Sequence, residues 1–106
     1  MEVINGEVFN LNTIGLEKGK TSVYQLVSKE QGAGANVLYV VQDVSDTSSF
    51  SSSYEYEFYF VLDGEINMVT SRREITLKSG DGIIIKGEQP VKVTSLTPSK
   101  FFVVSL

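Results

Sequence analysis

The 106-residue sequence contains no cysteine and no histidine. Without cysteine the chain can form no disulfide, thiolate nucleophile or cysteine-ligated metal site. Without histidine it lacks the side chain whose ordinary pKa lies nearest neutrality, which is also the commonest protein ligand of transition metals. We therefore expect no metal and no other cofactor, and chemistry that depends on a histidine base or a cysteine nucleophile is excluded.

Positive charge is also scarce. Nine Lys and Arg residues are set against 13 Asp and Glu residues, a net charge of -4, and the only adjacent cations are Arg72 and Arg73. A nucleic-acid surface needs several cations on one face, so we expect no nucleic-acid partner. The N-terminal residues resemble no secretory signal, and no apolar run approaches the length of a membrane helix. We expect a soluble, cytoplasmic protein with no membrane partner.

The sequence is rich in short apolar and β-branched runs separated by turn residues. The expected strands are 22–28, 37–44, 54–62, 65–70, 73–78, 83–86, 91–96 and 101–105. Residues 3–11 are typical of a short hairpin or a bent edge strand, and the serine-rich stretch 45–53 is typical of a flexible loop, either a lid or a plain connection. The pattern predicts an all-β sandwich or barrel, formed by one domain over residues 1–106.

One stretch carries a more specific pattern. Glu57 is followed after six residues by Gly64, within Phe-Val-Leu-Asp-Gly-Glu at 60–65, and 15 residues separate Gly64 from Gly80. This stretch resembles the cupin superfamily, in which the first motif reads Gly-x5-His-x-His-x3-4-Glu-x6-Gly and the second begins with a glycine. The resemblance implies a jelly-roll β-barrel, or double-stranded β-helix, with little or no helix.

The same resemblance locates the family's metal ligands, three histidines and a glutamate, of which only Glu57 is present here. The histidine positions correspond to Ser51 and Ser53, or to Phe50 and Ser52 with the longer spacer, and to Val91. A catalytic metal site needs at least three protein ligands; serine is a poor ligand for transition metals, and valine is not a ligand. The sequence therefore predicts a barrel without the family's metal, which argues against metal-dependent enzyme activity.

Strand alternation places Glu57 and Tyr59 on one face, shared by Glu55 if no bulge intervenes. The resemblance implies that this face lines the barrel, where Glu57 is either a polar contact with a raised pKa or a solvated group at the mouth. The leading hypothesis is a protein that binds a small organic molecule, such as a sugar, an organic acid or an aromatic. The candidate ligand-binding residues are Glu57, Tyr59, Glu55, Ser51, Ser53, Val91 and Tyr39.

Two other hypotheses stay open at this point. One is a metal-independent isomerase, epimerase or lyase that uses Glu57 for proton transfer, and the other is a structural or protein-interaction module whose barrel is filled by side chains. Arg72 and Arg73 fit a carboxylate or phosphate site, or a solvated turn. The aromatic residues of 54–60 that face away from the barrel interior, together with the family's habit, predict a homodimer.

Overall fold

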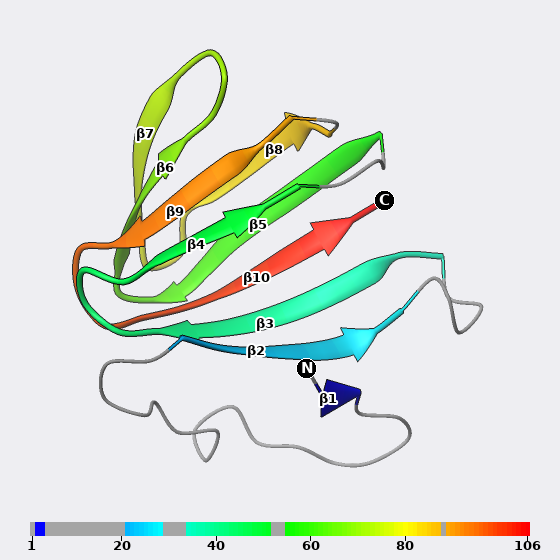
Figure 1. Ribbon diagram of the computed structural model, residues 1–106, viewed down its shortest axis with the longest axis horizontal. Coiled ribbons are helices and arrows are strands. Elements are labelled where there is room, and N and C mark those ends of the chain that lie inside the picture. Colours follow the sequence, from blue (N-terminus) through cyan, green and yellow to red (C-terminus); the bar gives the residue numbers. More distant parts are fainter. Residues whose placement is uncertain (1, 4–20, 29–33, 52–54, 88) are drawn as a thin grey trace.

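The computed structural model describes residues 2–3, 21–28, 34–51, 55–87 and 89–106. These residues form ten strands and no helix (Figure 1). The strands are β1 (Glu2–Val3), β2 (Thr21–Val27), β3 (Asn36–Gln42), β4 (Thr47–Phe50), β5 (Tyr56–Asp63), β6 (Glu65–Val69), β7 (Glu74–Lys78), β8 (Gly82–Lys86), β9 (Val91–Ser95) and β10 (Ser99–Ser105). Within this part of the chain no helix could therefore cross a membrane. The all-β prediction is confirmed.

The strands form two sheets. Six strands follow the order β1-β2-β3-β10-β5-β8, and four follow the order β4-β9-β6-β7. Every pair is antiparallel except β1 with β2. From β3 onward each connection crosses from one sheet to the other, except the β6–β7 hairpin, which stands at the upper left of Figure 1. This alternation of sheets is the jelly-roll arrangement.

Side chains on the inner faces of the two sheets form one core. On β5, Glu57, Tyr59 and Val61 are buried, and the intervening residues are exposed. Strand alternation produces this pattern because successive side chains point to opposite faces of a sheet. The core side chains are Val40, Tyr59, Val61, Ile66, Met68, Leu77, Ile85, Val91, Val93, Phe101 and Val103.

One sequence-based expectation needs correction, and another lies almost wholly outside the described residues. The stretch 45–53 was expected to be a loop or lid, but Thr47–Phe50 is strand β4, hydrogen-bonded along β9. Serine and threonine can occupy this edge strand because its backbone pairs with β9 and the Phe50 ring packs against the rings of Tyr59 and Phe101. Ser53 lies outside the described residues. Of the expected hairpin at 3–11 only Val3 is described, and it pairs with β2 in a parallel register.

One end of the molecule, which we call the Gln42 end, holds the turns at 43–46, 63–64, 79–81 and 96–98. The side chain of Gln42 is fully buried there. Its Nε2 atom donates to the carbonyls of Asp46, at 2.9 Å, and Val93, at 3.1 Å, and its Oε1 atom accepts from the Ser48 hydroxyl. These bonds join β3 to β9 and to the β3–β4 turn, so the amide connects the two sheets.

The turn between β5 and β6 at the Gln42 end requires glycine. Gly64 has a φ of 89°, in the left-handed region, and a Cβ atom there would collide with the carbonyl oxygen of Pro98. Gly80 shares this φ of 89°, but a Cβ atom at this position would meet no heavy atom within 4 Å. The two glycines of the cupin-like pattern thus both mark turns, and Gly64 also permits a close approach of two backbone segments.

Candidate functional site

At the opposite end, which we call the Glu57 end, a carboxylate is buried between two strands. Glu57 on β5 lies opposite Ser105 on β10 and Ile85 on β8. Only 2% of Glu57 is exposed. Its Oε2 atom accepts a long hydrogen bond of 3.5 Å from the Ser105 hydroxyl, whereas Oε1 has no partner among the described residues.

A second polar group, the Tyr59 hydroxyl, is buried two residues further along the same face. Tyr59 is 0% exposed, and its hydroxyl is close enough to the Glu57 carboxylate to affect the pKa of both groups, but it forms no well-aligned hydrogen bond with any described residue. The Phe50 ring packs edge-on against the Tyr59 ring, with their centroids 6.0 Å apart. A buried polar atom without a partner is destabilising by about 1–3 kcal/mol, so these two atoms can both accept a further hydrogen-bonding partner, such as a ligand or an ordered water.

Burial changes the proton affinity of both groups. Desolvation raises the pKa of Glu57 above its ordinary value of 4.5, and the Ser105 and Tyr59 hydroxyls partly oppose that increase. Desolvation, followed by the nearby negative charge of Glu57, raises the pKa of Tyr59. Tyr59 therefore stays a neutral hydroxyl that can donate a hydrogen bond. Glu57 takes up a proton more readily than an exposed glutamate does.

The other predicted site residues differ from Glu57 in their surroundings. Glu55 and Ser51 are exposed, Ser53 lies outside the described residues, and Val91 is 1% exposed within the core. Val91 also lines a pocket of about 350 Å³ formed by β4, β6 and β9, together with Pro90 and Thr70 of the β6–β7 turn. The structure thus brings Glu57 and Tyr59 together and gives Val91 a place in the apolar core.

Tyr39 lies on the other face of the six-stranded sheet. Its ring packs against Tyr24 and Phe102, with centroids 6.4 Å and 5.1 Å away. The register explains this placement, because Tyr39 is paired with Phe102, which in turn is paired with the outward-facing Phe60. The expectation that Tyr39 shares a site with Glu57 is therefore wrong. The sequence alone does not determine which face of the sheet an aromatic side chain in a strand occupies.

Sequence reasoning did not assign the roles of two contributors to the Glu57 end. Ser105, which donates to Glu57, comes from the last strand, 48 residues away in sequence. Phe50, which covers Tyr59, belongs to the stretch expected to be a loop and also packs against Phe101, with centroids 6.2 Å apart. Phe50 was the one large apolar side chain in that serine-rich stretch, and this contrast was the available signal.

The described structure was compared with known proteins. No protein-family model matches the sequence, and no curated protein matches it. A cupin superfamily protein from Desulfitobacterium hafniense superimposes with a TM-score of 0.78 over 98% of this chain and 94% of its own, at 12% identity. The chain has the cupin fold. An RmlC-like cupin from Desulfovibrio desulfuricans gives a TM-score of 0.75 over 95% of each chain, at 16% identity. A conserved protein of unknown function from Streptococcus pyogenes gives 0.80 over 97% of this chain and 89% of its own, at 13% identity.

The described part of the barrel does not offer the donor set that a transition metal needs. Among the described residues no group of three or more His, Cys, Asp or Glu side chains is placed to hold a metal ion. Of the positions that correspond to metal ligands, Val91 is apolar and packed in the core, Ser51 is exposed, and only Glu57 is a carboxylate facing inward. One carboxylate and apolar neighbours do not fit a transition metal.

Proposed function

We propose that this cupin barrel binds a small, hydroxyl-bearing organic molecule at the Glu57 end. The observation that supports this function is the pair of buried, unpartnered polar atoms, Oε1 of Glu57 and the hydroxyl of Tyr59, on one face of β5. A ligand hydroxyl can donate to the carboxylate and accept from the phenol, and so supply the hydrogen bonds that both groups lack.

The side chains around Glu57 and Tyr59 restrict which functional groups the ligand can carry. Phe50 lies on β4, an edge strand of its sheet, and provides an apolar ring beside Tyr59. A ring face of this kind packs against the apolar face of a sugar or an aromatic group. An ionised carboxylate on the ligand would be repelled by an ionised Glu57, so we expect a hydroxyl, rather than an acid group, to face Glu57.

A thermal-shift screen with sugars, aromatic alcohols and organic acids tests this function, because a ligand that binds the native state raises its stability. We expect Glu57→Gln and Tyr59→Phe to reduce the shift given by a hit, and Glu55→Gln, which removes an exposed carboxylate two residues away, to leave it unchanged. Hits that shift all four proteins equally would contradict the proposal. Turnover of a hit that disappears in Glu57→Gln would instead identify a metal-independent isomerase or lyase.

A second candidate function is self-association through the outer face of the six-stranded sheet. Large apolar side chains are exposed on this face, on β5 and on the neighbouring edge strand β8. They are Tyr56, Phe58, Phe60, Leu62 and Ile84, the last of them 58% exposed. An apolar face of this kind can pack against a second copy of itself across a twofold axis.

Light scattering coupled to size-exclusion chromatography tests the homodimer. We expect the wild-type protein to elute with twice the mass of one chain, and Phe58→Ser with Ile84→Lys to elute as a monomer. The matched control is Val69→Lys, which alters an exposed apolar side chain on the other sheet. A monomeric wild-type protein would contradict this second candidate and leave the Glu57 site unaffected.

A further inference from the structure

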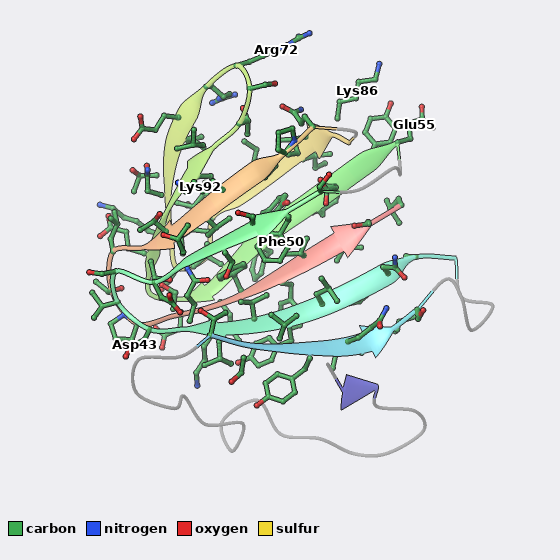
Figure 2. All side chains as sticks on the ribbon, viewed as in Figure 1. Asp43, Phe50, Glu55, Arg72, Lys86 and Lys92 are labelled. Carbon is green, nitrogen blue, oxygen red and sulfur yellow. The ribbon has the colours of Figure 1, made fainter. Side chains whose placement is uncertain are left out.

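A pocket of about 480 Å³ lies between the β6–β7 hairpin and the end of β8. Its walls are formed by residues 70–73 of the hairpin turn and by 85–87 and 89 on the other side. Figure 2 shows Arg72 at the tip of the hairpin and Lys86 at the end of β8, both at the same end of the molecule. The pocket is large enough for a small organic anion and is open to solvent on one side.

The charge in this pocket is unlike that of the chain as a whole. Arg72 and Arg73, the only arginines of the sequence, line it together with Lys86, so three of the nine cations of a protein with net charge -4 line one hollow. The described lining residues include no carboxylate, and none of these three cations forms an ion pair with a described residue. Glu74, the first residue of β7, is hydrogen-bonded by Asn67 at 3.0 Å instead.

Hydrogen bonds hold the walls of the pocket in place. The Thr70 hydroxyl oxygen accepts from the backbone amides of Arg72, at 3.3 Å, and Arg73, at 3.2 Å, and so fixes the turn that carries both guanidinium groups. Ser71 donates through its hydroxyl to Oε1 of Gln89 at 3.0 Å. This bond connects the two walls, and Gln89 in turn donates through Nε2 to the Lys86 carbonyl of its own wall at 2.7 Å.

We propose that this pocket binds an oxyanion, a carboxylate or phosphate group carried by a small molecule. Guanidinium groups match these anions because each can form two parallel hydrogen bonds, and a lysine adds a third positive charge. Three cations in a hollow are too few to follow a nucleic-acid backbone, which favours a small molecule. The proposal does not rest on the Glu57 site, although Ile85 at the pocket wall is paired with Glu57 across β5 and β8.

Isothermal titration calorimetry of the purified protein with inorganic phosphate and, separately, with malonate tests this site. Both titrations use the same ionic strength, set with sodium chloride, because dissolved salt weakens the attraction between the anion and the cationic side chains. We expect Arg72→Gln combined with Arg73→Gln, and Lys86→Gln alone, each to weaken binding by about tenfold or more, the size expected for loss of a charge-assisted hydrogen bond. These side chains are exposed, so the variants should fold.

The matched control is Lys78→Gln, which removes an exposed cation from β7 outside the pocket. We expect it to bind both anions with the wild-type affinity. Binding of phosphate alone or of malonate alone would support the site and identify which oxyanion it takes. The proposal would be overturned if neither anion bound, or if Lys78→Gln weakened binding as much as the pocket variants did.

Discussion

Gln42 and Glu57 are both long polar side chains buried between the same two sheets, but their surroundings differ. At the Gln42 end the amide donates to the carbonyls of Asp46 and Val93 and accepts from Ser48, so each of its polar atoms has a partner. At the Glu57 end one carboxylate oxygen has no described partner. Asp43, next to Gln42, and Glu55, two residues before Glu57, lie at opposite ends of the molecule (Figure 2).

This difference in hydrogen bonding supports a structural role for Gln42 and is consistent with the ligand-binding role proposed for Glu57. A buried polar group whose hydrogen bonds are complete stabilises one arrangement of the sheets. A buried polar group left incomplete is destabilising unless a ligand or ordered water supplies its partner. The hydroxyl of Ser95, buried near the Gln42 end without a described partner, is the exception there. We therefore expect substitutions at the Gln42 end to be more destabilising than those at the Glu57 end.

The largest effect is expected from Gly64→Ala. The added methyl group would meet the Pro98 carbonyl in a residue with a φ of 89°, so we expect a loss of roughly 3 kcal/mol or more in the free energy of unfolding, measured with urea. Gly80→Ala is the matched control, because it has the same φ and open space around the new Cβ atom. Its loss should be only about 1–2 kcal/mol, the cost of the backbone conformation alone. Equal losses would show that the contact with Pro98 is unimportant.

Gln42→Leu should come next. The variant keeps a side chain of similar size but loses the bonds to the carbonyls of Asp46 and Val93 and from the hydroxyl of Ser48. The Asp46 carbonyl keeps its bond from the Ser95 backbone amide. We expect a loss of about 2–3 kcal/mol in the same urea measurement. Stability equal to that of the wild-type protein would contradict the structural role assigned to this amide.

Glu57→Gln should have a smaller effect that depends on pH. Burial raises the pKa of Glu57 in the folded protein, so the folded state favours the protonated form. Protonated Glu57 therefore contributes its full stabilisation at pH values below the pKa of this carboxyl in the unfolded chain. That contribution is lost as the pH rises through the pKa of the carboxyl in the folded protein. Near pH 4 the free energies of unfolding of the variant and the wild-type protein should differ by no more than about 1 kcal/mol. As the pH rises, the variant should become the more stable of the two. A stability difference that does not change with pH would contradict the assigned environment.

Tyr59→Phe should have the smallest effect on stability. It removes a hydroxyl that has no described partner, so we expect the free energy of unfolding to stay the same or to rise by less than about 1 kcal/mol. Tyr39→Phe is the matched control, because its hydroxyl is also buried without a described partner but lies on the other face of the sheet. Only Tyr59→Phe should weaken binding of a ligand found by thermal shift. A decrease of more than 1 kcal/mol in the free energy of unfolding of Tyr59→Phe would show that the Tyr59 hydroxyl has a hydrogen-bond partner in solution.

The sequence predicted the parts of this molecule that depend on local pattern. Alternation along β5 correctly placed Glu57 and Tyr59 inward, and the turn glycines correctly marked strand ends. It could not predict β4, because the strand character of 47–50 depends on pairing with β9, more than 40 residues later in the sequence. The Ser105 partner of Glu57 and the juxtaposition of the arginines with Lys86 were also beyond the sequence, since both arise from pairing between distant strands.

The burial of Glu57 in a chain without histidine or cysteine has a practical consequence. Apart from the amino terminus, no group with an ordinary pKa changes charge between pH 5.5 and 7.5 here, as expected from the reference values of about 4 for carboxyls and about 10 for Tyr and Lys. Burial raises the pKa of Glu57, which moves its change of charge upward in pH, toward this range. Calorimetry in two buffers of different ionisation enthalpy measures the number of protons taken up or released when a ligand binds. A proton exchange that disappears in Glu57→Gln would show that the ligand changes the pKa of this carboxyl.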